Sequence, residues 1–345
     1  MHVENNKAID IKNFNVIELE AFVASLGENR YRARQIMEWV YHHNASSFEE
    51  MTSLPKEFRT KISIASYISN PNIKKIQTSS DGTHKFLFEL KDGNCIEGVL
   101  IPEKKHRTIC LSTQVGCALG CKFCLSGKRG LVRNLDASEI VNQICAIKND
   151  FLTKNETFNI VFMGMGEPLA NYKNTLKTLQ ILTTPFGFNL SHRRITVSTA
   201  GLLPQIKKLG EELPVNLAIS LNAANNSLRN SLMPINKKYS LDKLLEVASK
   251  ASLPSRKRIT FEYILIKNIN DSLEDAKELA SVLRGMRCKI NLISFNEHEG
   301  VEFERPDDKA VEQFRQYLVA KHFTVMVRES KGGNISAACG QLALV

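Results

Sequence analysis

The chain has 345 residues, 43% of them hydrophobic, and a formal net charge of +10. This composition excludes a globally disordered protein, and the length suits one barrel-sized domain with a small appendage. No apolar stretch approaches the roughly 18 residues of a membrane span, and the N-terminus lacks the apolar segment of a secretory signal. We therefore expect a cytoplasmic protein without a membrane partner, whose eight cysteines serve metal or redox chemistry.

The positive charge is unevenly distributed. Residues 1–80 hold ten Lys and Arg against nine Asp and Glu, a net of +1, whereas residues 101–200 hold thirteen against six, a net of +7. A polyanion such as a nucleic acid, bound over the second segment, would account for this excess. A mildly basic solvated surface would account for it equally well.

The first 75 residues predict a small helical accessory domain. Apolar residues recur at helical spacing over residues 14–26 and again from Tyr31, and Pro55 opens a further short helix. The run from Ser46 to Glu50 has the pattern of an N-cap followed by an acidic first turn, which predicts one more helix start.

A strand-like period replaces the helical one from about residue 84. Runs at 85–90 and 95–101 flank an Asp-Gly-Asn turn and predict a β-hairpin extension over residues 76–105. Strands and helices then alternate to the C-terminus, which predicts an α/β domain over residues 106–345 with a parallel sheet curled into a partial (β/α)6 barrel. The expected strands are 107–112, 158–163, 194–198, 215–221, 258–266, 289–295 and 323–328, and the expected helices are 137–150, 172–183, 202–209, 241–251, 272–283 and 307–320.

Polar motifs follow several of these strands. In parallel sheets, ligands bind at the carboxyl ends of the strands. The motifs that end strands there are Gly166-Glu167 within a Gly-Met-Gly-Glu-Pro run, Ser198, Ser220-Leu221-Asn222 and Asn296. We expect these residues to meet at one edge of the sheet.

Three cysteines form the most specific motif. Cys117, Cys121 and Cys124 have C-x3-C-x2-C spacing, which places three thiolates on one loop without a fourth. A [4Fe–4S] cluster normally takes four thiolates, so three would leave one iron open for a small molecule. A zinc site would need a fourth ligand, which is not evident nearby, and inert cysteines are the other alternative.

The triad resembles that of the radical S-adenosylmethionine (SAM) superfamily, and further features narrow the resemblance to one family. The features are the Gly-Met-Gly-Glu-Pro run at 164–168, the Ala-Ala-Cys-Gly-Gln-Leu run at 337–342, Cys110, and the segment that begins at Arg30. Together they resemble the RlmN family of dual-specificity RNA adenine-C2 methyltransferases, over residues 15–342. The sister family Cfr methylates adenine C8 and tends to have Ala where this chain has Pro168.

The resemblance implies a radical SAM barrel, a [4Fe–4S] cluster held by Cys117, Cys121 and Cys124, and two SAM molecules per turnover. Gly166, Glu167, Ser198, Ser220, Leu221, Asn222 and Asn296 would bind SAM. One SAM would methylate Cys339, and a second would give a 5′-deoxyadenosyl radical that abstracts hydrogen from this methyl group. The resulting methylene would add to C2, Glu97 would remove the C2 proton, and Cys110 would attack the Cys339 sulfur to release the RNA and leave a transient disulfide.

Each of these roles has a structural alternative. Cys110 lies in an apolar run and could be a packed core thiol. Glu97 also lies in an apolar run, where a carboxylate is costly unless it is functional, although it could face solvent from an edge strand. The family commonly has His where this chain has Asn222, so details of SAM binding are expected to differ.

By the same resemblance, the substrates are an adenosine of the peptidyl-transferase centre in 23S rRNA and the adenosine 3′ of the tRNA anticodon. An electron donor such as flavodoxin and a monomeric enzyme are also expected. The alternatives are a C8 methyltransferase, a zinc-stabilised RNA-binding module, and a radical enzyme that acts on a protein.

Overall fold

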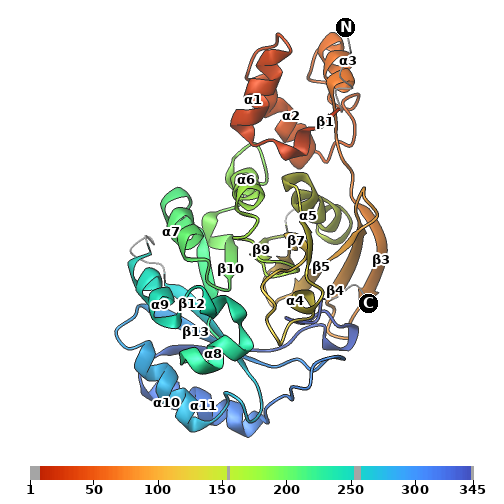
Figure 1. Ribbon diagram of the computed structural model, residues 1–345. Helices are drawn as coiled ribbons and strands as arrows, with labels where there is room; N and C mark the ends of the chain where they lie inside the picture. Colours follow the sequence, from red (N-terminus) through yellow and green to blue (C-terminus); the bar gives the residue numbers. More distant parts are fainter. Residues whose placement is uncertain (1–7, 154–155, 252–257, 343–345) are drawn as a thin grey trace.

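One large sheet organises the molecule (Figure 1). The computed structural model describes residues 8–153, 156–251 and 258–342. Over these residues the large sheet has ten strands in the order β14-β13-β12-β11-β10-β9-β6-β5-β4-β3. The strands are β3 Asn72–Thr78, β4 His84–Glu89, β5 Cys95–Pro102, β6 Arg107–Cys110, β9 Phe158–Phe162, β10 Ile195–Thr199, β11 Asn216–Ser220, β12 Ile259–Leu265, β13 Cys288–Ser294 and β14 Thr324–Arg328.

Neighbouring strands from β6 to β14 pair in parallel, as the alternation of strands and helices predicts. Helices in the crossovers lie along the outer side of the sheet (Figure 1). They are α5 Ala137–Phe151, α6 Tyr172–Thr183, α7 Leu203–Glu212, α9 Leu241–Lys250, α10 Leu273–Val282 and α11 Asp308–Ala320. The crossover between β11 and β12 also contains the short helix α8 Asn226–Leu232, which contacts the carboxyl ends of β10 and β11. The predicted α/β class and the predicted strand–helix order are confirmed, whereas α8 is an element that the sequence did not reveal.

Three antiparallel strands extend the sheet beyond β6. The predicted hairpin is β4–β5, and its turn contains Gly93 at φ +80°, where Asp92 accepts a hydrogen bond from the backbone N–H of Asn94. The edge strand β3 was not predicted, because its Lys-rich sequence lacks the apolar alternation of a half-buried strand. This extension matters for the site because its β3–β4 turn contacts the C-terminal loop.

The N-terminal helices are α1 Val16–Ser25, α2 Arg32–Tyr41 and α3 Lys56–Ala65. They enclose a core of their own, and the short strands β1 Ile9–Asp10 and β2 Ser66–Tyr67 pair in parallel beside them. Residues of α5 and α6 join this core, so the helices pack directly onto the barrel (Figure 1). The predicted domains also include residues 1–7 and 343–345, which lie outside the described residues.

The predicted helix start at Ser46 is wrong, because the segment forms a turn. The Glu50 carboxylate accepts hydrogen bonds from the N–H groups of Ser46 and Ser47, so it satisfies the turn without a helix. Phe48 and Met51 are buried in the N-terminal core, which draws this part of the chain inward. Within the described residues, no helix is both long and apolar enough to cross a membrane.

Candidate active site

The three-cysteine loop connects two short strands that the sequence did not reveal, β7 Gln114–Gly116 and β8 Leu131–Asn134. Gly116 has φ +75°, and a Cβ there would stand 1.9 Å from the carbonyl oxygen of Gly130. Only glycine permits this approach. The Cys117 N–H donates to the same carbonyl at 3.0 Å, which closes the base of the loop.

The three thiols lie close together in a protected environment. Burial raises the pKa of Cys117 to about 11, with a further rise from Cys124, and burial also raises the pKa of Cys121, to which both other cysteines add. Burial raises the pKa of Cys124 as well, although hydrogen bonds from the N–H groups of Gly127 and Ser126 oppose it. These N–H groups belong to the short helix α4 Leu125–Lys128, whose first turn faces the sulfur.

Among the described residues, no three His, Cys, Asp or Glu side chains converge tightly enough to ligate a single metal ion. A cubane cluster has a different requirement, because each of its thiolates binds a separate iron at a separate corner. A loop of three mutually interacting but unconverged thiols therefore fits a cluster better than zinc.

A cavity lies beside this loop at the carboxyl ends of the strands. It brings together the three cysteines and residues that follow β9, β10 and β11, which are three of the four strand ends that the sequence predicts would meet. Its polar and reactive lining comprises Cys117, Cys121, Cys124, Gly166, Glu167, Ser198, Thr199, Ser220, Asn222, Glu262 and Cys339. We call this space the cofactor cavity.

Gly166 and Glu167 form one wall of the cofactor cavity. Gly166 has φ +97°, and a Cβ there would lie 2.5 Å from the Cβ of Gln114. Gln114 accepts the N–H of Glu167 at 2.8 Å, and the Glu167 carboxylate accepts the N–H groups of Leu169 and Ala200. Burial nevertheless raises the pKa of Glu167 to about 7. A buried carboxylate that faces a cavity suits a cationic amino group.

Ser198, Ser220 and Asn222 also line the cofactor cavity. Ser198 donates to the buried carboxylate of Glu262 at 2.9 Å. Asn222 has φ +60°, which asparagine tolerates better than most residues, and its amide oxygen accepts the N–H of Ile264 at 2.9 Å. Leu221, between them, is fully buried in the core and does not line the cavity.

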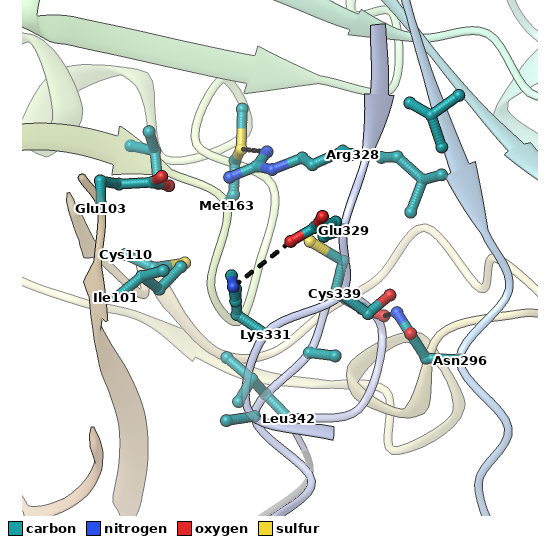
Figure 2. Close-up of a pocket in the computed structure, with 16 residues that line it drawn as sticks. Ile101, Glu103, Cys110, Met163, Asn296, Arg328, Glu329, Lys331, Cys339 and Leu342 are labelled. Carbon is teal, nitrogen blue, oxygen red and sulfur yellow. Dashed lines mark hydrogen bonds and ion pairs between the residues drawn. The ribbon is translucent and has the colours of Figure 1, made fainter. Parts of the chain in front are cut away.

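A second cavity, of about 310 Å³, lies next to the first, because Cys339 lines both. Figure 2 shows the residues around this second cavity. We call it the thiol cavity, because Cys110 and Cys339 both point into it. Its volume falls at the lower end of the range for small-molecule sites, about 300–1,000 Å³. Asn296 also lines the thiol cavity rather than the cofactor cavity, and its side-chain amide donates to the Cys339 carbonyl at 3.2 Å.

Cys339 lines both cavities and so stands between them. Its residue surface is accessible through these cavities. Desolvation by the surrounding protein raises the pKa of the Cys339 thiol, and the positive charge of Arg328 opposes this rise. Cys110 ends β6, and burial raises its pKa to about 12. Arg328, at the end of β14, opposes that rise too.

Like Leu221, the predicted site residue Glu97 lies apart from both cavities. It is 1% exposed in β5 and pairs with Lys85, whose Nζ lies 3.0 Å from Glu97 Oε1. Glu97 is not among the residues that line either cavity. The buried position excludes the alternative of a carboxylate that faces solvent.

Three charged residues of the site were not predicted. Arg328 and Glu262 approach each other at 3.9 Å and connect the thiol cavity with the cofactor cavity. Arg229 is buried beneath the cofactor cavity, where it contacts the ends of β10 and β11. A signal did exist for Glu262, because it interrupts the apolar run of β12 just as Glu97 interrupts that of β5.

The fold and the three-cysteine loop define the class of protein. Residues 111–280 match the family model of the Radical SAM superfamily. A crystal structure of a radical SAM methyltransferase from Sphaerobacter thermophilus superposes with a TM-score of 0.92 and 42% identity, over 98% of this chain and 100% of that one. The protein is therefore a radical SAM enzyme, of a superfamily that uses a [4Fe–4S] cluster and SAM.

More specific matches identify the family. Residues 9–68 match the model "Ribosomal RNA large subunit methyltransferase N-terminal domain". The dual-specificity RNA methyltransferase RlmN of Geotalea uraniireducens is 50% identical, over 97% of this chain and 96% of its own length. That of Geobacter sulfurreducens is 51% identical, over 97% and 92%. The chain belongs to the RlmN family, which confirms the resemblance inferred from its motifs.

Proposed function

We propose that this protein methylates C2 of adenosine in 23S rRNA and in tRNA through a methylated Cys339. One observation carries this proposal most directly: Cys339 faces the cofactor cavity on one side and the thiol cavity with Cys110 on the other. A cysteine that receives a methyl group and passes it to a base needs access to both compartments. The relatives named dual-specificity RNA methyltransferase RlmN match this chain nearly end to end.

The residues present suit the cluster and SAM. Cys117, Cys121 and Cys124 would hold the cluster on one loop. Gly166 and Glu167 would bind the amino end of SAM, because the Glu167 carboxylate lines the cavity and is held in place by two backbone N–H groups. Ser198, Ser220 and Asn222 would bind its remaining polar groups. When bound, the cluster and SAM supply a methyl group and a carbon-centred radical that takes hydrogen from the methylated cysteine.

Cys339 is the proposed nucleophile and methyl carrier. Sulfur attacks as the thiolate, and the positive charge of Arg328 favours that form against the effect of burial. Asn296 holds the carbonyl of the same residue, so it acts here through the position of Cys339 as well as through the predicted contact with SAM.

Cys110 is the proposed resolving thiol. It shares the thiol cavity with Cys339, and its attack on the Cys339 sulfur would form a disulfide while the methylated base leaves. The alternative of a packed core thiol explains its burial but not its position beside the cavity.

Glu97 remains our proposed base for the C2 proton. In this role the Glu97 carboxylate must leave its ion pair with Lys85 to gain access to the bound adenosine. Glu97→Gln, which keeps the shape of the side chain, should slow release of RNA from the covalent intermediate more than it slows methylation of Cys339.

The RNA would bind over the active-site mouth. We propose a helical RNA-binding unit over residues 1–75, a β extension over 76–105 and a catalytic core over 106–345. The reacting base would leave its stack to enter the thiol cavity, and the basic surface of residues 101–200 would contact phosphates. With such substrates the protein would act in the cytoplasm, as a monomer reduced by a donor such as flavodoxin.

The experiment that tests this mechanism uses Cys110→Ala. The variant should accumulate a covalent protein–RNA adduct, seen as a gel-shifted band after incubation with SAM, reductant and unmodified tRNA. Cys95→Ala is the matched control, because Cys95 lies at the start of β5 and lines neither cavity. Free methylated RNA at the wild-type yield from Cys110→Ala would remove Cys110 from the mechanism.

A further inference from the structure

The C-terminal end of the loop of residues 329–342, which we call the Cys339 loop, is hydrogen-bonded to helix α4 beside the three cysteines. The Leu125 N–H donates to the Gly340 carbonyl at 2.9 Å, and the Ser126 hydroxyl donates to the Leu342 carbonyl at 2.7 Å. These bonds attach the end of the Cys339 loop to helix α4 directly after Cys124. The first half of the loop has different partners, which lie in the β3–β4 hairpin.

The β3–β4 turn contacts that first half. Asp81 accepts the Gly332 N–H at 3.0 Å through Oδ2, and the N–H of Thr83 in its own turn at 3.0 Å through Oδ1. The Ser79 hydroxyl bonds to the side-chain oxygen of Asn334 at 2.5 Å. Burial alone would raise the pKa of Asp81, but the two N–H donors outweigh it and lower the pKa to about 2. Asp81 therefore contacts the Cys339 loop as an anion.

Close packing accompanies these bonds. Gly332 has φ +67°, and a Cβ there would lie 2.7 Å from the Cβ of Ala337 and 2.9 Å from a methyl carbon of Thr83. The Ala337 N–H donates back to the Gly332 carbonyl at 2.9 Å. The Cys339 loop therefore folds on itself at Gly332, and at this point it packs closely against the β3–β4 hairpin.

Lys85, in β4, supplies the third contact. Its side chain is 3% exposed, and its Nζ donates to the Ser336 carbonyl at 3.4 Å while it pairs with Glu97 at 3.0 Å. A buried ammonium group needs such partners, since desolvation is otherwise costly. One ammonium thus connects β5 with the main chain three residues before Cys339.

We propose that Asp81 and Lys85 are positioning residues, which hold the Cys339 loop so that the Cys339 sulfur stays at the junction of the cofactor cavity and the thiol cavity. With the main chain attached on both sides, the sulfur passes from one cavity to the other mainly by rotation of its side chain. The inference rests on the proposed function of Cys339. Its physical basis is that reactions between tethered groups depend steeply on how well their geometry is held.

Asp81→Asn is the sharpest test. The amide has one acceptor oxygen for two N–H donors, so its NH2 group must face either Gly332 or Thr83, and one of the two bonds by which Asp81 joins its turn to the Cys339 loop is replaced by a donor–donor contact. Asp92→Asn is the matched control, because Asp92 caps the neighbouring β4–β5 turn and pairs with Arg133 without touching the Cys339 loop.

The readout is amide hydrogen exchange of the full-length, cluster-loaded protein, followed by mass spectrometry. For Asp81→Asn we expect peptides from residues 329–342 to exchange about tenfold faster, with peptides of β5 and β6 unchanged. The kcat for methylation should fall while the KM values for SAM and RNA stay within about twofold, because the substrate sites are intact. Asp92→Asn should leave exchange of the loop at the wild-type rate.

Lys85 is tested in a variant that avoids an orphaned buried charge. Lys85→Met combined with Glu97→Gln removes both charges, so folding is preserved, and exchange of the Cys339 loop should again accelerate. Wild-type exchange of residues 329–342 in both Asp81→Asn and this double variant would overturn the inference. Because exchange needs no turnover, that result would be separate from any failure of the proposed methylation.

Discussion

Arg229 offers the most quantitative test of how the site is supported. Its side chain is 1% exposed, in α8, and donates to the carbonyls of Leu221 at 3.0 Å, Ala200 at 2.8 Å and Ser220 at 3.2 Å. A fourth bond reaches the Asn236 side chain at 2.9 Å. One guanidinium thus ties together the ends of β10 and β11, from which the cofactor cavity is built.

The perturbation is Arg229→Met, which keeps much of the volume and removes every donor. Three buried carbonyls would lose a partner at about 1–2 kcal/mol each, a total of about 3–6 kcal/mol. Part of this free energy is regained, because the variant no longer has to desolvate a guanidinium group. The cost of that desolvation is also what lowers the pKa of Arg229 to about 10. We expect a net loss of about 3 kcal/mol in the free energy of unfolding.

The assay is urea unfolding of the variant and of Arg133→Met. Arg133 has shorter contacts with carboxylates, at 2.6 Å to Asp92 and 2.7 Å to Glu139, but its side chain is 31% exposed. Exposed ion pairs contribute little, so Arg133→Met should cost only about 1 kcal/mol. If Arg229→Met shifted the unfolding midpoint no further than Arg133→Met, with equal slopes, the reasoning from burial would be refuted.

Two further predictions concern the chemistry of the cavities. Gly166→Ala places a methyl group against Gln114 at a residue with φ +97°, so it should weaken SAM binding by at least about tenfold. Cys110→Ala is the control and should bind SAM as the wild type does. Equal SAM affinities of the two variants by calorimetry would contradict this prediction. Because the pKa of Cys110 is raised to about 12, its thiolate fraction grows about tenfold per pH unit. Release of RNA from a preformed adduct should therefore accelerate about a hundredfold between about pH 7 and 9. A rate that levels off below pH 8 would show that another group limits the release.

Strands with a buried apolar pattern were predictable from the sequence, and those with a polar pattern were not. The runs of β9, β12 and β13 are apolar because helices cover the parallel sheet. The strand β3 at the sheet edge and the short pair β7–β8 are stabilised by partners distant in sequence, which no local pattern reveals.

The site was predictable where its residues follow one another in recognisable motifs. The cysteine loop and the Gly166-Glu167 wall lie where the spacing predicted. Leu221 shares a motif with two cavity residues, yet it faces the core. Arg229 and Asp81 are single charged residues whose contacts depend on chain segments that only folding brings together.

The most direct test of the account is mass spectrometry of nucleosides from unmodified 23S rRNA and tRNA, after incubation with cluster-loaded protein, SAM and a reductant. We expect 2-methyladenosine in both RNAs, and none from a Cys339→Ala variant. 8-Methyladenosine would contradict the proposed position of methylation. Unmodified adenosine from a protein that still cleaves SAM would contradict the proposed substrates.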